Sequence, residues 1–468
     1  MFDIQTRRQF LNATGMGLGA SVLGNLTAQG ATGTHGYHLP KAKAKRVIFL
    51  FMAGAPSQLD LFDYKPDLHK RFKEALPDSV TNGQRVTAMT KGKEKLVAPS
   101  MFKFKQHGQG GTHLSELLPH LGSVADDIAL IKSTSTTAIN HDPGKTLFCT
   151  GTEIPGKASI GAWLSYGLGR MNQNLRDFIV LNSAYWTGGK GNVQGLYSRL
   201  WGSGFLPSKH QGVSFQPSGD PVLFLSNPKS VTRESRHKML DLVTKLNEEH
   251  IAKVGDPEIQ TTIAQQEMAF RMQASVPELT DLSGESKKTL EMYGATPGDG
   301  SYASNCLLAR RLVEKGTRFV QLYHRGWDHH GDLDKYMKVC CKHTDQATYA
   351  LLTDLKQRGL LQDTLVVWGG EFGRTPMFQV KGGPGRDHHI KGFSMWMAGG
   401  GVKPGLSYGA TDELGYKAQK DVVHVRDFHA TLLHLLGIDH HRFSKKFQGL
   451  DMRLTGVEPA KVVKGILS

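Results

Sequence analysis

The feature that most constrains the fold is a theme that recurs from about residue 46, in which a short apolar run is followed by a turn and an amphipathic helix. The apolar runs occupy residues 47–52, 178–181, 319–323, 364–368 and 393–397. Helical patterns occupy residues 302–314, 345–358 and 427–436. Continuous apolar runs are typical of strands buried on both faces. The alternation therefore predicts an α/β fold, doubly wound, with a largely parallel sheet and helices on both faces.

The N-terminus has the pattern of a twin-arginine (Tat) export signal. Arg7 and Arg8 precede an uncharged stretch rich in Gly, Ala and Leu at about 15–26, and cleavage is expected near Ala28. The alternative is a flexible basic N-terminus. A Tat signal predicts a periplasmic or exported protein, which folds before it meets the Tat translocase. The stretch is too short and too Gly-rich to span a bilayer, so we expect no transmembrane segment in the mature chain.

The chain divides into three parts by pattern. Residues 1–28 form the signal peptide, residues 40–184 and 301–458 follow the α/β theme, and residues 185–300 break it with Gly-rich, aromatic and long polar helical segments. We interpret residues 185–300 as an inserted cap or rim. The four cysteines have no framework spacing and are expected to be buried thiols. A metal role for Cys340 and Cys341 is the alternative.

The net charge narrows the range of partners. Lys and Arg number 57 against 42 Asp and Glu, which gives +15 at pH 7. Such a surface favours anionic partners: phosphate or sulfate esters, acidic polysaccharide, nucleic acid or anionic lipid. Export and the absence of a recognised reading motif argue against nucleic acid. The 21 histidines also direct attention to metal sites.

Candidate functional residues gather in loops beside the predicted strands. These segments are residues 54–60, 327–330, 369–374 and 385–389. In a parallel α/β sheet, functional residues collect beyond the carboxyl ends of strands. Carboxylates or imidazoles occur in all four segments, so we expect one shared site.

The proposed metal ligands are Asp328, His330, Glu371, Asp387 and His388. Asp328 and His330 are two positions apart and share one face in extended backbone. Carboxylate with imidazole is the ligand mix of zinc, manganese or iron, whereas calcium prefers oxygen alone. For one such cluster alone, a solvated loop with satisfied hydrogen bonds is the alternative. The recurrence of these residues in several loops favours a divalent metal.

Residues 140–145 supply a candidate catalytic group. His141 stands at a predicted helix start, where backbone N–H groups and Lys145 favour an oxyanion. His141 is the first candidate nucleophile or general acid/base, and Ser57 is the second. The alternative is an ordinary helix start capped by Asn140 or Asp142. The proposed substrate-binding residues are Asn140, Lys145, Arg374, Arg386 and His389, and for either arginine alone a surface charge is the alternative.

Three segments resemble the alkaline-phosphatase/sulfatase superfamily of metal-dependent hydrolases. They are residues 359–371 (GLLQDTLVVWGGE), 141–151 (HDPGKTLFCTG) and 425–437 (VRDFHATLLHLLG). In this resemblance Glu371 falls on a metal-binding Asp, and Lys145 replaces an Arg. His141 takes the position of the residue that sulfatases convert to formylglycine, so formylglycine chemistry is not available there. Asp328, His330 and His388 resemble the Asp/His/His set that holds one metal in the phosphatase branch.

The chain more closely resembles a family of Tat-exported bacterial proteins catalogued as domain of unknown function number fifteen hundred and one. The similar segments include residues 54–66, 202–207, 327–330, 368–376, 385–388 and 398–402. The resemblance as a whole covers nearly the entire mature chain. The resemblance implies an alkaline-phosphatase-like fold and no established activity.

Two functions remain open from the sequence. The first is a metal-dependent hydrolase of phosphate or sulfate esters, sulfatase-like but without the formylglycine nucleophile, acting on an anionic small molecule or polysaccharide ester. The second is a catalytically silent binder of sulfated or acidic polysaccharide on the same fold. The acidic pair that sulfatases carry after the first strand is absent from Gly54 to Ser57, which suits the binder.

Overall fold

A nine-stranded sheet forms the centre of the molecule. The computed structural model describes residues 36–81, 87, 91–92, 94–184, 193–216, 221–222, 227, 230–255, 257–379 and 384–468. The sheet order is β12-β4-β11-β8-β1-β7-β5-β6, and β15 also pairs with β4. The strands are β1 (Arg46–Ala53), β4 (Ile128–Ser135), β5 (Phe178–Asn182), β6 (Val213–Phe215), β7 (Phe319–Arg325), β8 (Thr364–Gly369), β11 (Phe393–Ala398), β12 (Leu406–Tyr408) and β15 (Val423–His424). Within this sheet only the pairs that involve β11 are antiparallel, so the predicted largely parallel sheet is confirmed.

The central strand β1 shows why the apolar runs form this sheet. β1 lies between β7 and β8 and is parallel to both. Because successive side chains of a strand point to opposite faces, its residues divide between two cores. Ile48, Leu50 and Met52 belong to one core, whereas Val47, Phe49 and Phe51 belong to the other. A strand buried on both faces needs apolar residues at every position, which the sequence supplies.

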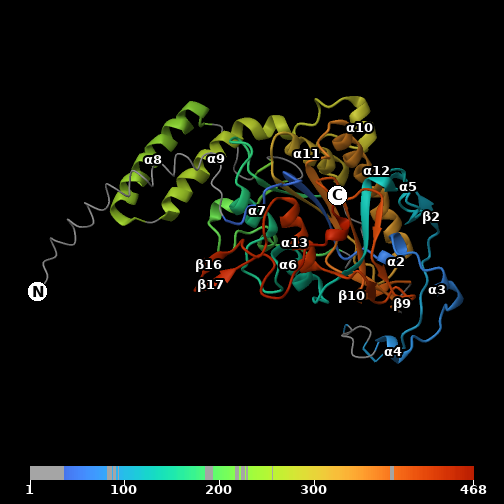
Figure 1. The fold of residues 1–468 in the computed structure, drawn as a ribbon. Coiled ribbons are helices and arrows are strands. Elements are labelled where there is room, and N and C mark those ends of the chain that lie inside the picture. Colours follow the sequence, from blue (N-terminus) through green and yellow to red (C-terminus); the bar gives the residue numbers. More distant parts are fainter. Residues whose placement is uncertain are drawn as a thin grey trace, which may run out of the picture.

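Helices cover both faces of the sheet (Figure 1). One core takes side chains from α5 (Pro119–Ser123), α9 (Pro257–Thr280), α10 (Lys287–Tyr293), α11 (Tyr302–Glu314) and α12 (Leu333–Gln357). The other takes side chains from α6 (His141–Thr150), α7 (Ile160–Leu168) and α13 (Val425–Leu435). This arrangement confirms the doubly wound α/β class.

Two helix starts differ from the sequence prediction. The pattern predicts a helix from residue 345, but α12 begins at Leu333. Leu333, Met337 and Cys340 are buried at helical spacing, and the charged residues between them obscure this pattern. Helix α13 begins at Val425, with Asp427 inside its first turn accepting a hydrogen bond from the His424 N–H at 3.0 Å. All four cysteines are free and buried, as predicted.

Smaller elements complete the chain around the sheet. Four two-stranded ladders join β2 (Phe104–His107) to β3 (Thr112–Ser115), β9 (Gly373–Phe378) to β10 (Arg386–His389), β13 (Ala410–Thr411) to β14 (Ala418–Lys420), and β16 (Lys445–Phe447) to β17 (Leu450–Met452). Three four-residue helices lie early in the chain: α2 (Gln58–Leu61), α3 (Asp67–Lys70) and α4 (Asp78–Thr81).

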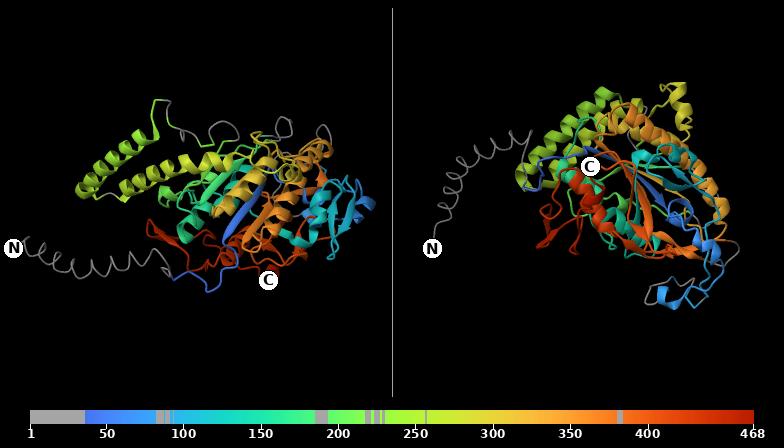
Figure 2. Two further views of the ribbon diagram at one scale, coloured as in Figure 1. Left: turned by 90° about the horizontal axis from the view of Figure 1, so that it is seen from above. Right: turned by 45° about the vertical axis from the view of Figure 1, so that its right-hand side comes forward.

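The segment predicted as an inserted cap contains a long helical hairpin. Helix α8 (Arg233–Val254) packs against α9, and the pair reaches away from the sheet (Figure 2). The predicted signal peptide at residues 1–28 lies outside the described residues. Within the part of the chain that the structure describes, no helix is long and apolar enough to cross a membrane.

Candidate metal centre

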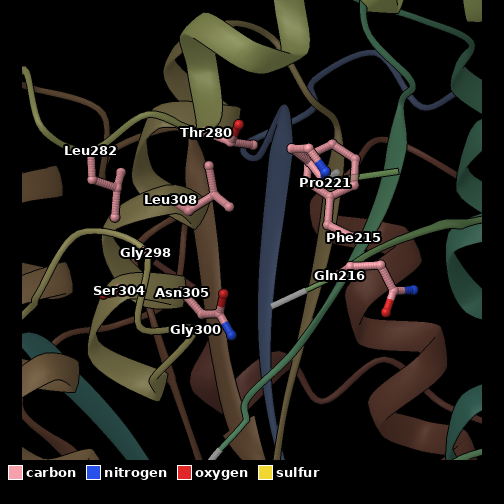
Figure 3. Close-up of a pocket in the computed structure, with 10 residues that line it drawn as sticks. All are labelled: Phe215, Gln216, Pro221, Thr280, Leu282, Gly298, Gly300, Ser304, Asn305 and Leu308. Carbon is pink, nitrogen blue, oxygen red and sulfur yellow. The ribbon is translucent and has the colours of Figure 1, made fainter. Parts of the chain in front are cut away.

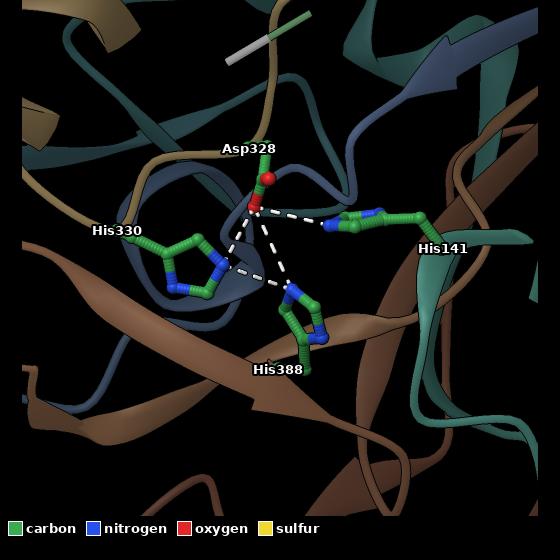
Figure 4. Close-up of side chains that lie close together, drawn as sticks. All are labelled: His141, Asp328, His330 and His388. Carbon is green, nitrogen blue, oxygen red and sulfur yellow. Dashed lines mark hydrogen bonds and ion pairs between the residues drawn. The ribbon is translucent and has the colours of Figure 1, made fainter. Parts of the chain in front are cut away.

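Four side chains from three separate parts of the chain converge beyond the sheet (Figure 4). His141 is the first residue of α6, Asp328 and His330 lie in the loop between β7 and α12, and His388 lies on β10. Each offers one ligand atom, and these atoms all lie within 4.8 Å of one another. We call this group the His–Asp cluster.

The three imidazoles of the His–Asp cluster all direct Nε2 toward Oδ1 of Asp328. The distances from Oδ1 are 3.1 Å for His141, 2.9 Å for His330 and 3.6 Å for His388. The Nε2 atoms of His330 and His388 are themselves 3.0 Å apart. Three imidazole nitrogens and one carboxylate oxygen are a donor set for zinc, manganese or iron.

The other nitrogen of each imidazole faces a hydrogen-bond acceptor. His141 Nδ1 lies 2.6 Å from Glu371 Oε1, and His388 Nδ1 lies 2.7 Å from the Ile139 carbonyl oxygen. His330 Nδ1 pairs with the side-chain oxygen of Gln379. In neutral imidazoles these contacts place the proton on Nδ1 and leave the Nε2 lone pair facing the cluster. Such outer acceptors are typical of metal-binding histidines.

Two donors hold the carboxylate of Asp328. Arg374 Nη2 donates to Oδ1 at 2.7 Å, and Gln194 Nε2 donates to Oδ2 at 2.8 Å. Burial alone would raise the pKa of Asp328, but the Arg374 charge and the imidazole contacts hold it well below its ordinary value. Asp328 therefore stays ionised and keeps its charge at the centre of the cluster.

The remaining electrostatics also suit a cation. Burial alone would raise the pKa of Glu371. The hydrogen bond with His141, together with the charges of His141 and Lys145, outweighs burial and lowers the pKa of Glu371. Burial lowers the pKa of His388 to about 4 and so favours its neutral form. Glu371 Oε2 is buried without a hydrogen-bond partner. An unpaired buried acceptor beside ionised carboxylates is what a bound metal would satisfy, so the residues fit a divalent ion.

Two glycines allow the loops of the cluster to approach one another. Gly54, just after β1, has φ +117°, and a Cβ there would lie 2.6 Å from the Asp328 nitrogen. The Gly54 N–H donates to Glu371 Oε1 at 3.0 Å. A Cβ at Gly385 would lie 2.1 Å from the His330 carbonyl oxygen. A side chain at either position would therefore push apart the segments that present the ligands.

The cluster is closed on one side and open on another. Phe372 is buried, and its ring centroid lies 5.0 Å from that of His141 and 4.7 Å from that of His388. The His330 side chain is 24% exposed, whereas that of Asp328 is 7% exposed. Solvent therefore reaches the cluster on the His330 side.

Lys145 is the basic side chain next to His141 on α6. It is one helical turn further along, is buried, and donates from Nζ to the carbonyl oxygen of Gly195. Burial lowers the pKa of Lys145, against the attraction of Glu371. The segment that contains Gly195 continues to Tyr197, whose ring lies 5.6 Å from Lys145 Nζ. Because Gln194 contacts Asp328, this segment links Lys145 to the cluster.

The two arginines proposed to bind substrate have other tasks. Arg374 supports Asp328 and also donates to the backbone oxygens of Gly54, Ala55 and Arg386. Arg386 uses all its N–H groups on the Asp60 carboxylate and on the carbonyl oxygens of Ala98, Pro99 and Thr375. Neither guanidinium therefore has two parallel N–H groups left to donate to a substrate anion.

Ser57, the second candidate nucleophile, belongs to the same surroundings as Arg386. Its hydroxyl donates to Asp60 Oδ2 at 2.5 Å, and Asp60 in turn accepts from Arg386 at 2.7 Å. We call Ser57, Asp60 and Arg386 the Asp60 network. The hydroxyl is committed to a carboxylate that is already charge-paired, and the structure places it outside the His–Asp cluster.

Three other predicted site residues also lie outside the His–Asp cluster. Asp387 accepts from Thr87 Oγ1 at 2.6 Å and from the backbone N–H of His388 at 2.8 Å. His389 is buried and bonds to the carbonyl oxygen of Tyr416. Asn140 is exposed and stands at the N-cap of α6 without a side-chain capping bond. Glu371, predicted as a ligand, contacts the cluster through His141.

Sequence reasoning missed the neutral residues that orient the cluster. Gln194 and Gln379 contact Asp328 and His330, respectively. A lone glutamine in a loop has no periodicity or spacing that marks it, so only the folded chain reveals these partners. His141 itself was expected as a nucleophile, and the structure places it as the fourth member of the cluster.

A separate cavity of about 160 Å³ lies between β6 and the start of α11 (Figure 3). Its lining is made of apolar, hydroxyl and amide residues, including Phe215, Asn305 and Leu308. None of its lining residues is an acid, a base or a histidine. The His–Asp cluster, rather than this cavity, is therefore the candidate site for chemistry.

The chain belongs to the family described as "Protein of unknown function (DUF1501)", whose model matches residues 44–467. This match confirms the family resemblance read from the sequence motifs. The comparison with curated proteins finds none that matches.

Three solved structures illustrate what the chain is similar to in fold. One is a protein in the alkaline phosphatase superfamily from Vibrio parahaemolyticus, 12% identical, covering 87% of this chain and 70% of that one, with a TM-score of 0.37. Another is alkaline phosphatase from the Antarctic bacterium TAB5, 11% identical, covering 85% and 99%, with a TM-score of 0.33. A third is Ps i-CgsB in complex with k-i-k-neocarrahexaose, 10% identical, covering 84% and 72%, with a TM-score of 0.38.

Proposed function

We propose that this protein is a metal-dependent hydrolase of phosphate or sulfate esters that works without a formylglycine nucleophile. The observation that supports it most is the convergence of three imidazole Nε2 atoms on Asp328 Oδ1, with each Nδ1 occupied by an acceptor. A purely structural histidine cluster has no need for this common orientation. The donor set favours zinc, manganese or iron over calcium.

His141, Asp328, His330 and His388 would hold the ion. When bound, such an ion supplies Lewis-acid polarisation of the ester and a water of lowered pKa. The protein residues supply the rest. Arg374 keeps Asp328 ionised and in place, and Glu371 holds the proton of His141 on Nδ1. Lys145 supplies positive charge near the developing negative charge of a bound ester.

The route to the site and the overall charge support an anionic substrate. The cluster opens on the His330 side, and the whole chain has a net charge of +15. An anionic small molecule or a polysaccharide ester therefore fits this proposal, and attraction by the positive surface would speed its encounter. We also propose export by the Tat route to the periplasm, which the twin-arginine pattern supports.

Metal analysis of protein purified without chelator tests the proposal. We expect about one equivalent of zinc, manganese or iron per chain. His330→Ala should lose the metal and the hydrolysis of p-nitrophenyl phosphate or sulfate. His69→Ala, which removes an exposed histidine of α3, should keep both and serves as the control.

The outcomes separate the hydrolase from its alternative. A folded protein without metal, or an active His330→Ala variant, would contradict the metal assignment. A metal that stays bound without turnover, together with salt-sensitive binding of a sulfated glycan, would support the silent binder.

A further inference from the structure

A cavity of about 250 Å³ lies on the sheet face that α10, α11 and α12 cover (Figure 1). Its lining comes from the end of α10, the start of α11, the middle of α12 and His324 of β7. Unlike the cavity beside β6, it is lined by ionisable side chains as well as by aromatic and small ones. It shares no residue with the His–Asp cluster, and we call it the His324 cavity.

The side chain of His324 is a fully buried polar group in this lining. On β7, Tyr323 points into the core of the opposite face, whereas the ring centroid of His324 lies 5.5 Å from that of Tyr302 on α11. Trp327 Nε1 donates a hydrogen bond to His324 Nδ1 at 2.9 Å. A neutral imidazole has one accepting and one donating nitrogen, so this bond places the proton of His324 on Nε2.

The Nε2–H group of His324 is a hydrogen-bond donor that the protein itself does not use. Nε2 is buried and has no hydrogen-bond partner among the described residues. Trp327, which holds the Nδ1 edge, is not part of the lining, so the opposite edge of the imidazole, with Nε2, is turned to the cavity. A buried N–H without an acceptor is destabilising, and an acceptor atom in the cavity would remove that cost.

Positive charge lies near this donor. Lys342 and His343 of α12 line the cavity, and Lys342 is exposed whereas His343 is half-buried. Burial lowers the pKa of His343, and the charge of Lys342 lowers it further. Burial likewise lowers the pKa of His324 to about 3, with smaller effects of His343 and Arg325, so the His324 ring is neutral. An anion would therefore meet the charge of Lys342 at the rim and a neutral N–H donor inside.

Asp299 is the only acid among the described residues of the lining. Its Oδ1 accepts hydrogen bonds from the Ser301 N–H at 2.8 Å and from the Ser304 hydroxyl at 2.7 Å. These bonds hold the carboxylate in the turn before α11 and partly offset its charge. The cavity therefore favours an anion over a cation.

Aromatic side chains form much of the remaining wall. The Tyr293 hydroxyl donates to Asp354 Oδ2 at 3.1 Å, and the Tyr302 hydroxyl pairs with that of Thr348 at 3.0 Å. Because both hydroxyls are engaged elsewhere, these tyrosines offer the apolar surface of their rings to a ligand. The volume of about 250 Å³ is below the roughly 300–1,000 Å³ of pockets for drug-sized ligands, so the ligand is small.

We propose that the His324 cavity binds a small organic carboxylate. One oxygen of the carboxylate accepts the hydrogen bond of His324 Nε2–H, and the other faces Lys342. The apolar part of the ligand packs against Tyr293 and Tyr302. This site is separate from the metal centre and does not rest on the proposed hydrolase function.

Calorimetric titration of the full chain with acetate, butyrate and benzoate tests the site. The amide of each acid is the matched probe, because it has nearly the same shape without the charge. We expect at least one of the carboxylates to bind with a Kd below about 1 mM, and its amide to bind at least about tenfold more weakly. If none of the three carboxylates binds, the cavity holds water only and the proposal is overturned.

Replacement of the exposed lysine tests the position of the bound charge. Lys342→Ala should weaken carboxylate binding about tenfold without changing the fold. Lys356→Ala is the matched control, because Lys356 is exposed further along the same helix and does not line the cavity. Equal affinity of the two variants would contradict binding in this cavity.

Two replacements of His324 separate its two nitrogens. His324→Gln places an amide N–H near the position of Nε2 and should keep the affinity within about threefold. His324→Asn places its amide near the position of Nδ1, does not reach the cavity, and should lose about tenfold or more. Circular dichroism confirms the fold of each variant. Equal affinity of the two folded variants would overturn the role of the Nε2–H donor, and if either fails to fold, the Lys342→Ala comparison decides.

Chelation distinguishes this cavity from the metal centre, which a carboxylate could also bind. The affinity should be the same before and after metal removal, and the same in His388→Ala, because the cavity and the His–Asp cluster share no residue. Loss of binding on chelation would place the carboxylate on the metal and overturn the proposal, without affecting the proposed hydrolase function.

Discussion

The His–Asp cluster and the Asp60 network are both buried groups of charged and polar side chains, but they differ in what they leave unpaired. In the Asp60 network, all the N–H groups of Arg386 donate hydrogen bonds, to Asp60 and to three carbonyl oxygens. In the His–Asp cluster, three imidazole nitrogens point at one carboxylate oxygen, and Glu371 Oε2 beside them has no hydrogen-bond partner. A satisfied buried group stabilises a fold, whereas an unsatisfied one indicates a ligand.

The two groups draw residues from the same short strand. Arg386 and His388 are two positions apart on β10, and a regular strand would place both side chains on one face. The pairing of β10 with β9 is irregular between these residues. Such irregularities redirect side chains and occur beside functional sites. This one separates a structural arginine from a candidate ligand.

The largest expected effect comes from breaking the satisfied group. Asp60→Asn should lower the free energy of unfolding by about 3–5 kcal/mol, because it leaves the buried Arg386 without its counter-charge. Chemical denaturation measures this change. Metal bound per folded chain should stay at the wild-type level. Loss of metal from the folded variant would show that the two groups are coupled.

Removing the metal should have the next largest effect. At a free metal concentration of a hundred times Kd, binding should add about 2.7 kcal/mol to the free energy of unfolding. Chelation should therefore lower the Tm of the wild-type protein. It should leave the Tm of His388→Ala unchanged, since that variant lacks a ligand, and an equal response of both proteins would contradict the site.

A smaller effect is expected from the outer acceptors. Gln379→Leu removes the side-chain oxygen that faces His330 Nδ1, and metal affinity should fall by about 10–100-fold. Competition with a metal indicator measures the affinity. An unchanged affinity would show that Gln379 has no part in orienting His330. Gln211→Leu, which replaces an exposed glutamine outside the cluster, is the control.

The smallest effect is expected at the surface. Arg71→Ala removes the pair with Glu74 at 2.9 Å, in which the side chains are 32% and 52% exposed. The free energy of unfolding should change by no more than about 0.5 kcal/mol, because exposed pairs contribute little. A decrease in the free energy of unfolding as large as that of Asp60→Asn would contradict the expectation that a charge pair stabilises the fold strongly only when it is buried and fully hydrogen-bonded.

The fold could be predicted largely from local pattern. Apolar runs such as 47–52 and 364–368 are typical of strands buried on both faces, and they form β1 and β8. The early start of α12 could not be predicted, because charged residues between Leu333 and Cys341 mask its apolar side. The antiparallel direction of β11 was equally hidden, since a buried run looks the same in either direction.

The candidate site was predictable only in its residue types. Sequence reasoning grouped Asp328, His330 and His388, and the structure brings them together. The sequence predicts a substrate-binding role for Arg386, because nothing in it shows that all the N–H groups of this guanidinium already donate hydrogen bonds within the protein. The position of His141 depends on the crossing of α6 with two distant loops, which spacing along the chain does not encode.

The central position of β1 has a consequence for the timing of synthesis. Among the described strands β1 leaves the ribosome first, yet its neighbour β8 pairs Thr364 with Arg46. At about 5–20 residues per second, translation takes roughly 16–64 s to travel from Arg46 to Thr364. β1 must therefore wait for both its partners, β7 and β8, while partly formed sheets are prone to aggregate. Until those two strands have been made, the apolar side chains on both faces of β1 lack the strands beside them, so this stage of synthesis is the one at which the chain is most exposed to misassembly.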